Sequence, residues 1–243
     1  MGYIDIHFHV LPGMDDGAGD METALEMLRL AHAEGISDII VTPHYTSGRF
    51  KADSQRVKEQ LDQLRERASE AQIPIRLYPG TEVYYRGGLE ERFESGELLT
   101  MNGTEYVLVE FSPSEDYMSI RTAMDDLFSM GLHPILAHAE RYQCLSRKVE
   151  YLRELRNMGC QIQVNAASVI GQWGFVTKRR VHRFLKEKLV DYIATDAHDT
   201  EKRKPAMKKC AKLLYKKYDK SYADALLFQN AKKRLLIQNK DSK

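Results

Sequence analysis

The 243-residue chain has little cysteine, and the cysteines present do not form a recognisable site. Cys144, Cys160 and Cys210 are an odd number, lie far apart and lack Cys-x-x-Cys spacing. This pattern suggests neither a disulfide framework nor a thiolate zinc site. We therefore expect all three cysteines to be reduced residues of the core.

The sequence also lacks a long apolar run and a linker. No run approaches the roughly 20 apolar residues of a membrane-spanning helix. The opening residues MGYIDIHFHV contain neither a basic leader nor a small-residue cleavage site, so we expect a cytoplasmic protein. No Pro-, Gly- or Ser-rich stretch interrupts the chain, and its apolar fraction of 43% suffices for a full core. We expect a single domain over residues 1–243.

Net charge is nearly absent, yet the basic residues are concentrated towards the C-terminus. The chain carries +1 overall, but residues 201–243 hold 14 Lys and Arg against 4 Asp and Glu. Such a segment can lie near an anionic membrane surface, although a solvated lysine face on a packed helix explains it more simply. The stretch AMKKCAKLLYKKYDKSYADALL has apolar residues at helical spacing. We therefore expect packed basic helices at about 204–240 and no nucleic-acid partner.

What the chain does contain is an alternation of short β-branched runs and helical patterns. Stretches such as METALEMLRLAHAEG and SQRVKEQLDQLRERASEA predict the helices. The predicted strands cover 3–8, 38–42, 75–80, 106–111, 133–138, 161–166 and 191–196. Apolar strands separated by helices indicate a parallel sheet covered on both faces. Seven such units predict an α/β fold, a distorted TIM-like (β/α)7 barrel, with a doubly wound open sheet as the alternative.

Metal-ligand types of side chain stand at the ends of six of the seven predicted strands. His7 and His9 share one face of the first strand, because residues i and i+2 point the same way. The ligand types at or just after the other strand ends are His44, Glu82, Glu110, His138, Asp196 and His198. Asp16 lies in the loop after the first strand, where capping the next helix is its alternative role. Because strand ends of a parallel barrel meet at one rim, this set predicts a polynuclear metal site.

The ligand types and two arginines favour phosphoester hydrolysis. Nitrogen and oxygen ligands suit Mn, Fe or Zn. A cluster of divalent ions lowers the pKa of a bridging water, supplies hydroxide and clamps the oxygens of an in-line displacement. Arg141 in HAER and Arg203 in DAHDTEKR would lie at the rim, where guanidinium groups bind phosphate in bidentate fashion. Surface ion pairing is the alternative role, chiefly for Arg203.

Several strings of the sequence carry a resemblance to a known family. They are DIHFHVLPGMDDGAGD, VTPHYTSGR, GTEVYY, LVEF, HAERY, VNAAS and TDAH. In this order, over residues 4–205, they resemble the PHP (polymerase and histidinol phosphatase) superfamily. Within it, the match is to the CpsB/YwqE-like protein-tyrosine phosphatases of Gram-positive capsule and exopolysaccharide systems. The resemblance implies a distorted TIM-like barrel with three metal ions, usually Mn²⁺.

The resemblance also implies a role for each candidate residue. The ligands that it implies for the first ion are His7, His9, Glu82 and Asp196. Those that it implies for the second ion are His44, Glu82, Glu110 and His138. Asp16 and His198 would help to hold a third ion. Arg141 and Arg203 match the phosphate-binding arginines of the family.

The substrate that the resemblance implies is phosphotyrosine on the tail of a bacterial tyrosine kinase that regulates polysaccharide export. Cysteine-dependent tyrosine phosphatases need an arginine six positions after the cysteine. The residues at those positions here are Glu150, Ala166 and Lys216. A thiolate nucleophile is therefore disfavoured, and metal hydroxide remains. Because a phenolate leaving group has a pKa of about 10, it needs little protonation; His198 is the candidate general acid.

Three alternatives remain open at this stage. A small-molecule phosphatase of the histidinol-phosphate type would share the metal site and differ in the loops above it. A metal-dependent amidohydrolase also begins with His-x-His, but it commonly bridges two metals with a modified lysine where this chain has Glu110. A non-catalytic regulatory module could keep the site for structure alone. The sequence gives no prediction of the oligomeric state.

Overall fold

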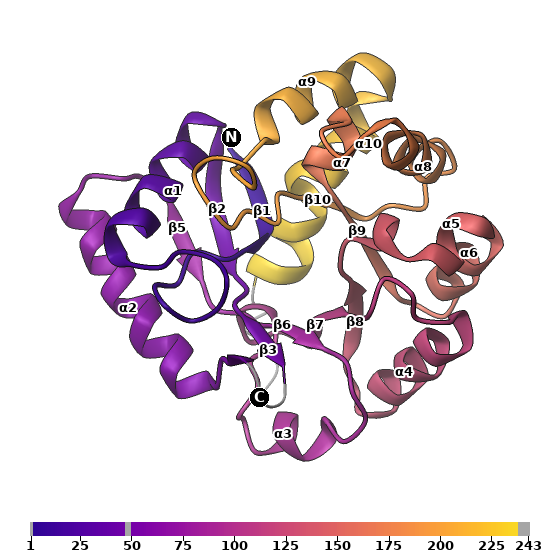
Figure 1. The fold of residues 1–243 in the computed structure, drawn as a ribbon, viewed down its shortest axis with the longest axis horizontal. Coiled ribbons are helices and arrows are strands. Elements are labelled where there is room, and N and C mark those ends of the chain that lie inside the picture. Colours follow the sequence, from indigo (N-terminus) through magenta and orange to yellow (C-terminus); the bar gives the residue numbers. More distant parts are fainter. Residues whose placement is uncertain (1, 47–49, 238–243) are drawn as a thin grey trace.

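A computed structural model describes residues 2–46 and 50–237. Its strands form a ring, and its helices lie outside this ring (Figure 1). One sheet has the order β1-β2-β5, and the other has the order β10-β9-β8-β7-β6-β3-β4. The first consists of β1 (Tyr3–Phe8), β2 (Ile36–Val41) and β5 (Arg76–Tyr78). The second consists of β3 (His44–Thr46), β4 (Phe50–Lys51), β6 (Glu82–Tyr84), β7 (Tyr106–Glu110), β8 (His133–Leu136), β9 (Gln161–Asn165) and β10 (Tyr192–Ala194). The strand pairs are parallel except for the β3–β4 hairpin.

The two sheets join into a distorted barrel. β2 continues after a short break as β3, and β5 continues as β6. Pro43 and Pro79 lie in these breaks, and proline has no amide hydrogen to donate to a strand ladder. At the other edge, Asp196 N donates to His7 O at 2.9 Å and so connects the end of β10 to β1. The predicted distorted TIM-like (β/α)7 barrel is confirmed.

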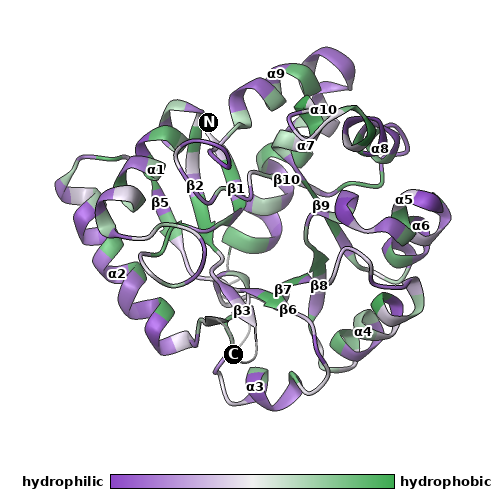
Figure 2. Cartoon of the chain, viewed as in Figure 1, coloured by the Kyte–Doolittle hydropathy of each residue, from purple (hydrophilic) through white to green (hydrophobic). Residues whose placement is uncertain are grey.

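Helices pack apolar stripes against the outside of the barrel. Figure 2 shows hydrophobic and hydrophilic residues alternating along α1, α2 and α4, as expected for helices with one buried face. The helices are α1 (Met21–Ala33), α2 (Ser54–Glu70), α3 (Glu90–Glu94), α4 (Tyr117–Ser129), α5 (Gln143–Arg147), α6 (Val149–Asn157), α7 (Ala166–Ile170), α8 (Phe175–Lys186), α9 (Met207–Lys217) and α10 (Lys220–Asp224). Asp20 caps α1, its side chain accepting from Thr23 N at 2.8 Å. The alternative role of Asp16 as this cap is therefore wrong.

The barrel interior has its own apolar cluster, to which strands from around the ring contribute. Its members include Ile4, Ile6, Ile40, Leu108, Ile135 and Tyr192. Ala231 and Leu235, from the C-terminal segment, complete it. The interior is thus a packed core beneath the carboxyl ends of the strands.

The C-terminal segment, with the short helices η3 (Ala225–Gln229) and η4 (Lys232–Leu236), closes the amino end of the barrel. Asn230 Nδ2 donates to Asp191 O at 2.9 Å, and Arg234 donates to the side chain of Gln161. Both acceptors lie where β10 and β9 begin, and Figure 1 shows this yellow segment within the ring. The rim that carries the strand ends is left open on the opposite side. Of the predicted helical region 204–240, positions 238–240 lie outside the described residues.

Several smaller expectations can be compared with the structure. Helix α9 buries Met207 and Leu214 while its lysines face solvent, as its apolar spacing predicts. Cys160 and Cys210 are buried free cysteines, but Cys144 is only half-buried and is not a core residue. Over the described residues, no helix combines the length and apolar character needed to cross a membrane.

Candidate metal centre

The structure brings all the predicted ligand residues together at the carboxyl ends of the strands. They are His7, His9, Asp16, His44, Glu82, Glu110, His138, Asp196 and His198. His44 and Glu82 were expected just after two strand ends. They are the first residues of β3 and β6, because the chain resumes strand pairing after each proline break. Most of the set is buried, whereas the side chain of Asp16 is 48% exposed and marks the solvent side of the site.

His7 and His9 point to one place, as their spacing predicts. Strand β1 has a register irregularity between Asp5 and Phe8, which lets Ile6 pack inside the barrel while both histidines face its mouth. Their Nε2 atoms lie 3.0 Å apart. Both rings are fully buried, so these atoms are available only to groups inside the site.

Glu82 lies at the centre of the cluster. Its Oε2 is 3.1 Å from His7 Nε2, 3.2 Å from His9 Nε2 and 3.0 Å from His44 Nδ1. Its other oxygen, Oε1, lies 3.0 Å from His138 Nε2. One carboxylate thus faces four imidazoles around the barrel mouth and could bridge two cations.

Glu110 extends the cluster along β7. Its Oε1 lies 3.1 Å from His44 Nδ1, and its Oε2 lies 3.4 Å from His138 Nε2. The register of the parallel strands sets this arrangement, because His44 pairs with Glu82 and Tyr84 pairs with Glu110 on successive strands. His44, Glu82 and Glu110 therefore form a second group of converging ligand atoms.

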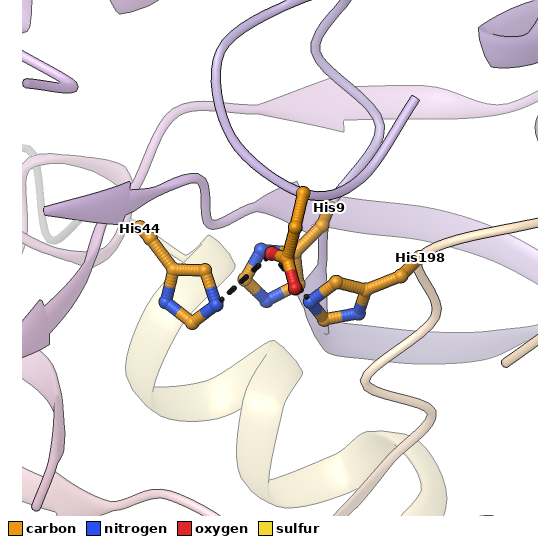
Figure 3. A group of neighbouring side chains, drawn as sticks. His9, His44 and His198 are labelled. Atoms are coloured by element: carbon orange, nitrogen blue, oxygen red, sulfur yellow. Dashed lines mark ion pairs between the residues drawn. The ribbon is translucent and has the colours of Figure 1, made fainter. Parts of the chain in front are cut away.

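A third group lies at the exposed edge, and Figure 3 shows the rings of His9, His44 and His198 gathered there. Asp16 Oδ1 lies 3.4 Å from His44 Nε2 and 3.3 Å from His198 Nε2. The His9 and His198 rings stack with centroids 3.8 Å apart. This group includes the predicted pair Asp16 and His198 and adds His9 and His44 to it.

Asp196 connects the cluster to the two predicted arginines. Its Oδ1 lies 3.5 Å from His7 Nε2, while its Oδ2 accepts a 2.5 Å bond from Arg141. Arg203 reaches both Asp196 Oδ1 and Asp16 Oδ2, each at 3.3 Å. Both guanidinium groups therefore lie at the edge of the cluster with part of their surface open to solvent.

Two site residues have unfavourable backbone conformations. His138 has φ 34° and Asp196 has φ 54°, in the left-handed region that non-glycine residues seldom adopt. His138 N donates to Gln163 Oε1 at 2.6 Å, and Asp196 N donates to His7 O, so neighbouring strands hold both conformations. Such conformations cost about 1–3 kcal/mol each and persist where the surroundings impose them.

The electrostatics of the cluster keep its carboxylates ionised. Burial opposes charge on Glu82, but His7 and His44 outweigh burial and hold the pKa of this carboxyl well below its usual range. Burial likewise opposes charge on Asp196, and Arg141 foremost lowers its pKa. Burial and the charge of Glu82 oppose ionisation of Glu110, yet its histidine neighbours lower its pKa. These carboxylates are therefore ionised although they are buried.

The imidazoles respond differently to the same surroundings. Burial favours the neutral form of His9, but Asp15 outweighs burial and raises the pKa of His9 to about 9. Burial and the neighbouring His9 lower the pKa of His198 to about 4. His198 is therefore neutral at pH 7, with Nε2 available as a ligand atom.

The residues present fit a group of divalent cations. Two ligand atoms that are each about 2.1 Å from one ion lie about 3.0–3.4 Å apart in tetrahedral or octahedral geometry, and the separations above fall mostly in this range. Glu82 Oε2 makes no hydrogen bond within the described residues, although histidine nitrogens lie within 3.2 Å of it. This arrangement is explained if the lone pairs of Glu82 Oε2 and of the histidine nitrogens are directed at a common point and not at one another.

Three further residues, which were not predicted from the sequence, orient the candidate ligands. Asp15 Oδ2 accepts from His9 Nδ1 at 2.7 Å and from His44 N at 2.9 Å. Gln163 Oε1 lies 3.3 Å from His7 Nδ1, and Asn165 Nδ2 donates to Asp196 Oδ2 at 2.8 Å. These contacts leave the Nε2 atoms of His7 and His9 for a cation. The Asp-Asp pair in MDDGA and the polar residues of QIQVN were the available indications.

Asp15→Asn is expected to weaken cation binding about 10–100-fold, because the amide cannot match the ionised acceptor that orients His9. Competition with a fluorescent chelator measures the affinity. Asp20→Asn, which keeps a side-chain cap on α1, is the matched control and should leave the affinity unchanged. Unchanged affinity in the Asp15 variant would contradict the orienting role.

A cavity of about 430 Å³ opens beside the arginines. Its lining includes Arg141, Arg203, Arg180 and Trp173. Trp173, the sole tryptophan of the chain, lies in the loop between α7 and α8 and is 46% exposed. Gln172 Nε2 donates to Lys202 O at 2.8 Å and so holds this loop against the loop of Arg203. The sequence alone did not indicate a role for Trp173 or Arg180.

The last three residues of the VTPHYTSGR string, 47–49, lie outside the described residues. The described part of the site therefore includes His44 from this string but not the tip of its loop. Burial raises the pKa of Cys144, Cys160 and Cys210 alike, which keeps them as thiols and agrees with the expected absence of a thiolate nucleophile.

Comparison with known proteins gives concordant results. The chain is 32% identical over 240 residues to the tyrosine-protein phosphatase CpsB of Streptococcus pneumoniae, covering 97% of this chain and 99% of that protein. It is 34% identical over 236 residues to the tyrosine-protein phosphatase YwqE of Bacillus subtilis, covering 97% of this chain and 92% of YwqE.

A solved structure from work on YwqE and CpsB, described as unique metal-dependent tyrosine phosphatases, superposes with a TM-score of 0.91 at 33% identity. The superposition covers 97% of this chain and 95% of the chain in the solved structure. The profile of the family described as "Capsular polysaccharide synthesis, CpsB/CapC" matches residues 3–236. The chain belongs to the CpsB/CapC family.

Proposed function

We propose that this protein is a metal-dependent phosphatase that hydrolyses phosphotyrosine in proteins. The observation that carries the proposal is the junction of the three ligand groups with a cavity lined by Arg141, Arg203 and Trp173. The similarity over nearly the whole chain to proteins named tyrosine-protein phosphatases supports it.

We infer that the site holds three divalent cations, with Mn²⁺ preferred and Fe or Zn as alternatives. Mixed carboxylate and imidazole ligands without thiolate support this choice. The first ion would be held by His7, His9, Glu82 and Asp196, the second by His44, Glu82, Glu110 and His138, and the third by Asp16 and His198 with His9 and His44. Bound cations lower the pKa of a coordinated water and offset the charge of a phosphate.

The chain's own residues bind and orient the phosphate. Arg141 and Arg203 present guanidinium groups to the cavity, and their bonds to Asp196 and Asp16 fix their direction. A guanidinium bound to a carboxylate on one edge can still donate to phosphate oxygens from its remaining N–H groups. The two arginines would thus hold the ester with its phosphorus facing the ligand cluster.

Departure of the tyrosine needs no strong acid from the protein. A phenolate has a pKa of about 10 and leaves far more readily than an alkoxide. His198 was the candidate general acid, but with its pKa lowered to about 4 it carries no extra proton at neutral pH. We therefore assign His198 to cation binding.

Trp173 favours a phosphotyrosine over a phosphoserine substrate. An exposed indole beside the phosphate-binding arginines can stack on the phenyl ring of phosphotyrosine, whereas phosphoserine offers no ring. Gly171 and Gly174, with φ 89° and 92°, form the two bends that bring the indole to the cavity.

Trp173→Ala is expected to lower kcat/KM for a phosphotyrosine peptide about tenfold, mainly through KM, by removing the stacking and its buried area. Hydrolysis of a phosphoserine peptide should change little. Met118→Ala is the control, since Met118 is 59% exposed and does not line the cavity. Equal losses on both peptides would contradict a role in ring recognition.

The proposed substrate in the cell is the phosphorylated tail of a bacterial tyrosine kinase of polysaccharide synthesis. The capsular polysaccharide context of the family supports this partner. Because kinases use ATP, such a tail would be phosphorylated in the cytoplasm, and we place the phosphatase there as well.

Turnover of a phosphotyrosine peptide, a phosphoserine peptide and histidinol phosphate by the Mn²⁺-loaded protein tests the proposal. We expect the phosphotyrosine peptide to be hydrolysed fastest and EDTA to abolish hydrolysis. Equal or faster hydrolysis of histidinol phosphate would reject the tyrosine assignment. No hydrolysis of any ester would favour a non-catalytic metal-binding module.

A further inference from the structure

A basic groove lies next to the proposed catalytic cavity, between α5 and α8, which are neighbours in Figure 1. It measures about 1030 Å³. The basic residues that line it are Arg147, Arg179, Arg180, Arg183 and Lys186. We propose that this α5/α8 groove binds an acidic or multiply phosphorylated segment next to the phosphotyrosine of the protein substrate, an inference that rests on the proposed function.

The charge of α8 is one-sided. Its sequence FVTKRRVHRFLK has five Lys and Arg and no Asp or Glu. Arg179, Arg183 and Lys186 are spaced i, i+4 and i+7 and therefore lie along one face of the helix. Because residues 1–200 as a whole are acidic, this face is a local reversal of the surface charge.

The arginines that line the groove have fewer carboxylate partners than the arginines of neighbouring helices. Within residues 2–46 and 50–237, Arg147 and Arg179 form no ion pair, and Arg180 donates to a carbonyl, Glu140 O. Arg183 lies 3.5 Å from Glu187, a carboxylate that also pairs with another arginine.

On adjacent helices the arginines have carboxylate partners. Arg121 pairs with Asp125 and Glu154, and Arg156 pairs with Asp191. The free guanidinium groups favour a site for an external anion.

Apolar side chains border the same groove. Val176, which lines it, is 71% exposed, and Phe175 and Trp173 precede it in the chain and are also exposed. Exposed large apolar residues clustered beside charge are typical of surfaces that bind polypeptide. An anionic lipid surface would be met by a flat or protruding patch, whereas this one is concave and rich in arginine.

The groove is continuous with the cavity, because Arg180 lines both. A chain whose phosphotyrosine occupied the cavity beside Trp173 would therefore pass its flanking residues along α8. Additional carboxylates or phosphates on those residues would meet Arg179, Arg183 and Arg147. This position ties the proposed partner to the substrate and not to a separate ligand.

The test uses full-length Mn²⁺-loaded protein and two phosphotyrosine peptides that differ only in neutral or Glu-rich flanks. The wild-type protein should prefer the acidic peptide by about tenfold in kcat/KM at low salt. Arg179→Glu with Arg183→Glu should remove this preference and leave hydrolysis of the neutral peptide and of phenyl phosphate unchanged. Lys209→Glu with Lys212→Glu makes the same charge change on α9, outside the groove, and should retain most of the preference.

Binding is measured separately by fluorescence anisotropy with the unphosphorylated acidic peptide. Its Kd should rise about tenfold in the α8 variant only. A preference retained in that variant, or lost equally in the α9 variant, would overturn the inference. So would weakened binding to phosphatidylserine vesicles with unchanged peptide binding. Wild-type protein that binds the acidic peptide through α8 but hydrolyses no phosphotyrosine would support the groove and reject the proposed function.

Discussion

Glu82→Gln is expected to lower kcat/KM for a phosphotyrosine peptide by about a thousandfold, the largest effect of any single substitution in the site. Glu82 is the one carboxylate within 3.2 Å of ligand atoms from four histidines of the described cluster. Glutamine keeps the size of the side chain but removes the charge that two cations would share. The loss should therefore appear both in activity and in bound metal.

Metal content measured by mass spectrometry separates this explanation from misfolding. The variant should retain fewer ions per chain while its circular dichroism spectrum stays that of the wild type. Glu105→Gln is the control, because the Glu105 side chain is 76% exposed and remote from the ligand groups. Full metal content with near-normal turnover in the Glu82 variant would contradict the bridging role.

The convergence of the candidate ligand residues could be predicted because a parallel barrel brings its strand ends together. Strands that alternate with helices run in one direction, so side chains at their carboxyl ends must meet at one rim. His7 and His9 were correctly expected to face the same way, although a register irregularity in β1 was needed to achieve it. The prediction depended on topology and not on the exact strand limits.

The residues that support the ligands could not be found in this way. Gln163 and Asn165 belong to β9, the predicted strand that ends without a metal-ligand type, and only the folded structure shows them touching His7 and Asp196. Asp15 is adjacent to Asp16 in sequence, and spacing alone does not reveal which of the two belongs to the candidate ligand groups. Such contacts depend on side-chain direction across strands.

Trp173 and the α5/α8 groove were missed for a different reason. Trp173 comes from a loop between two helices, and its significance depends on the neighbouring loop that carries Arg203. The basic sequence of α8 resembles an ordinary solvated helix until its unpaired arginines and its continuity with the cavity are seen. In the sequence, the basic residues stood out in segment 201–243 and not in α8. Part of that segment closes the amino end of the barrel.

Arg141→Ala is expected to lower kcat/KM for phosphotyrosine about a hundredfold while leaving the metal content unchanged. Arg141 donates to Asp196 at 2.5 Å and lines the cavity, so its loss removes a donor to the phosphate and leaves Asp196 with Asn165 and Arg203. A charge-assisted bidentate contact that forms with the phosphate is worth about 1.5–3 kcal/mol, or about 10–100-fold.

Arg141→Lys distinguishes geometry from charge at the same position. Lysine keeps the positive charge but cannot form the planar fork, so it should restore only a small part of the lost activity. Arg121→Ala, which breaks an exposed ion pair on α4, should leave turnover unchanged. Inhibition by inorganic phosphate should weaken in both Arg141 variants, because the free anion uses the same donors. If the Arg141→Lys variant had full activity and phosphate affinity, charge alone would explain the role of Arg141; if both variants lost metal, Arg141 would act through Asp196 and not through the substrate.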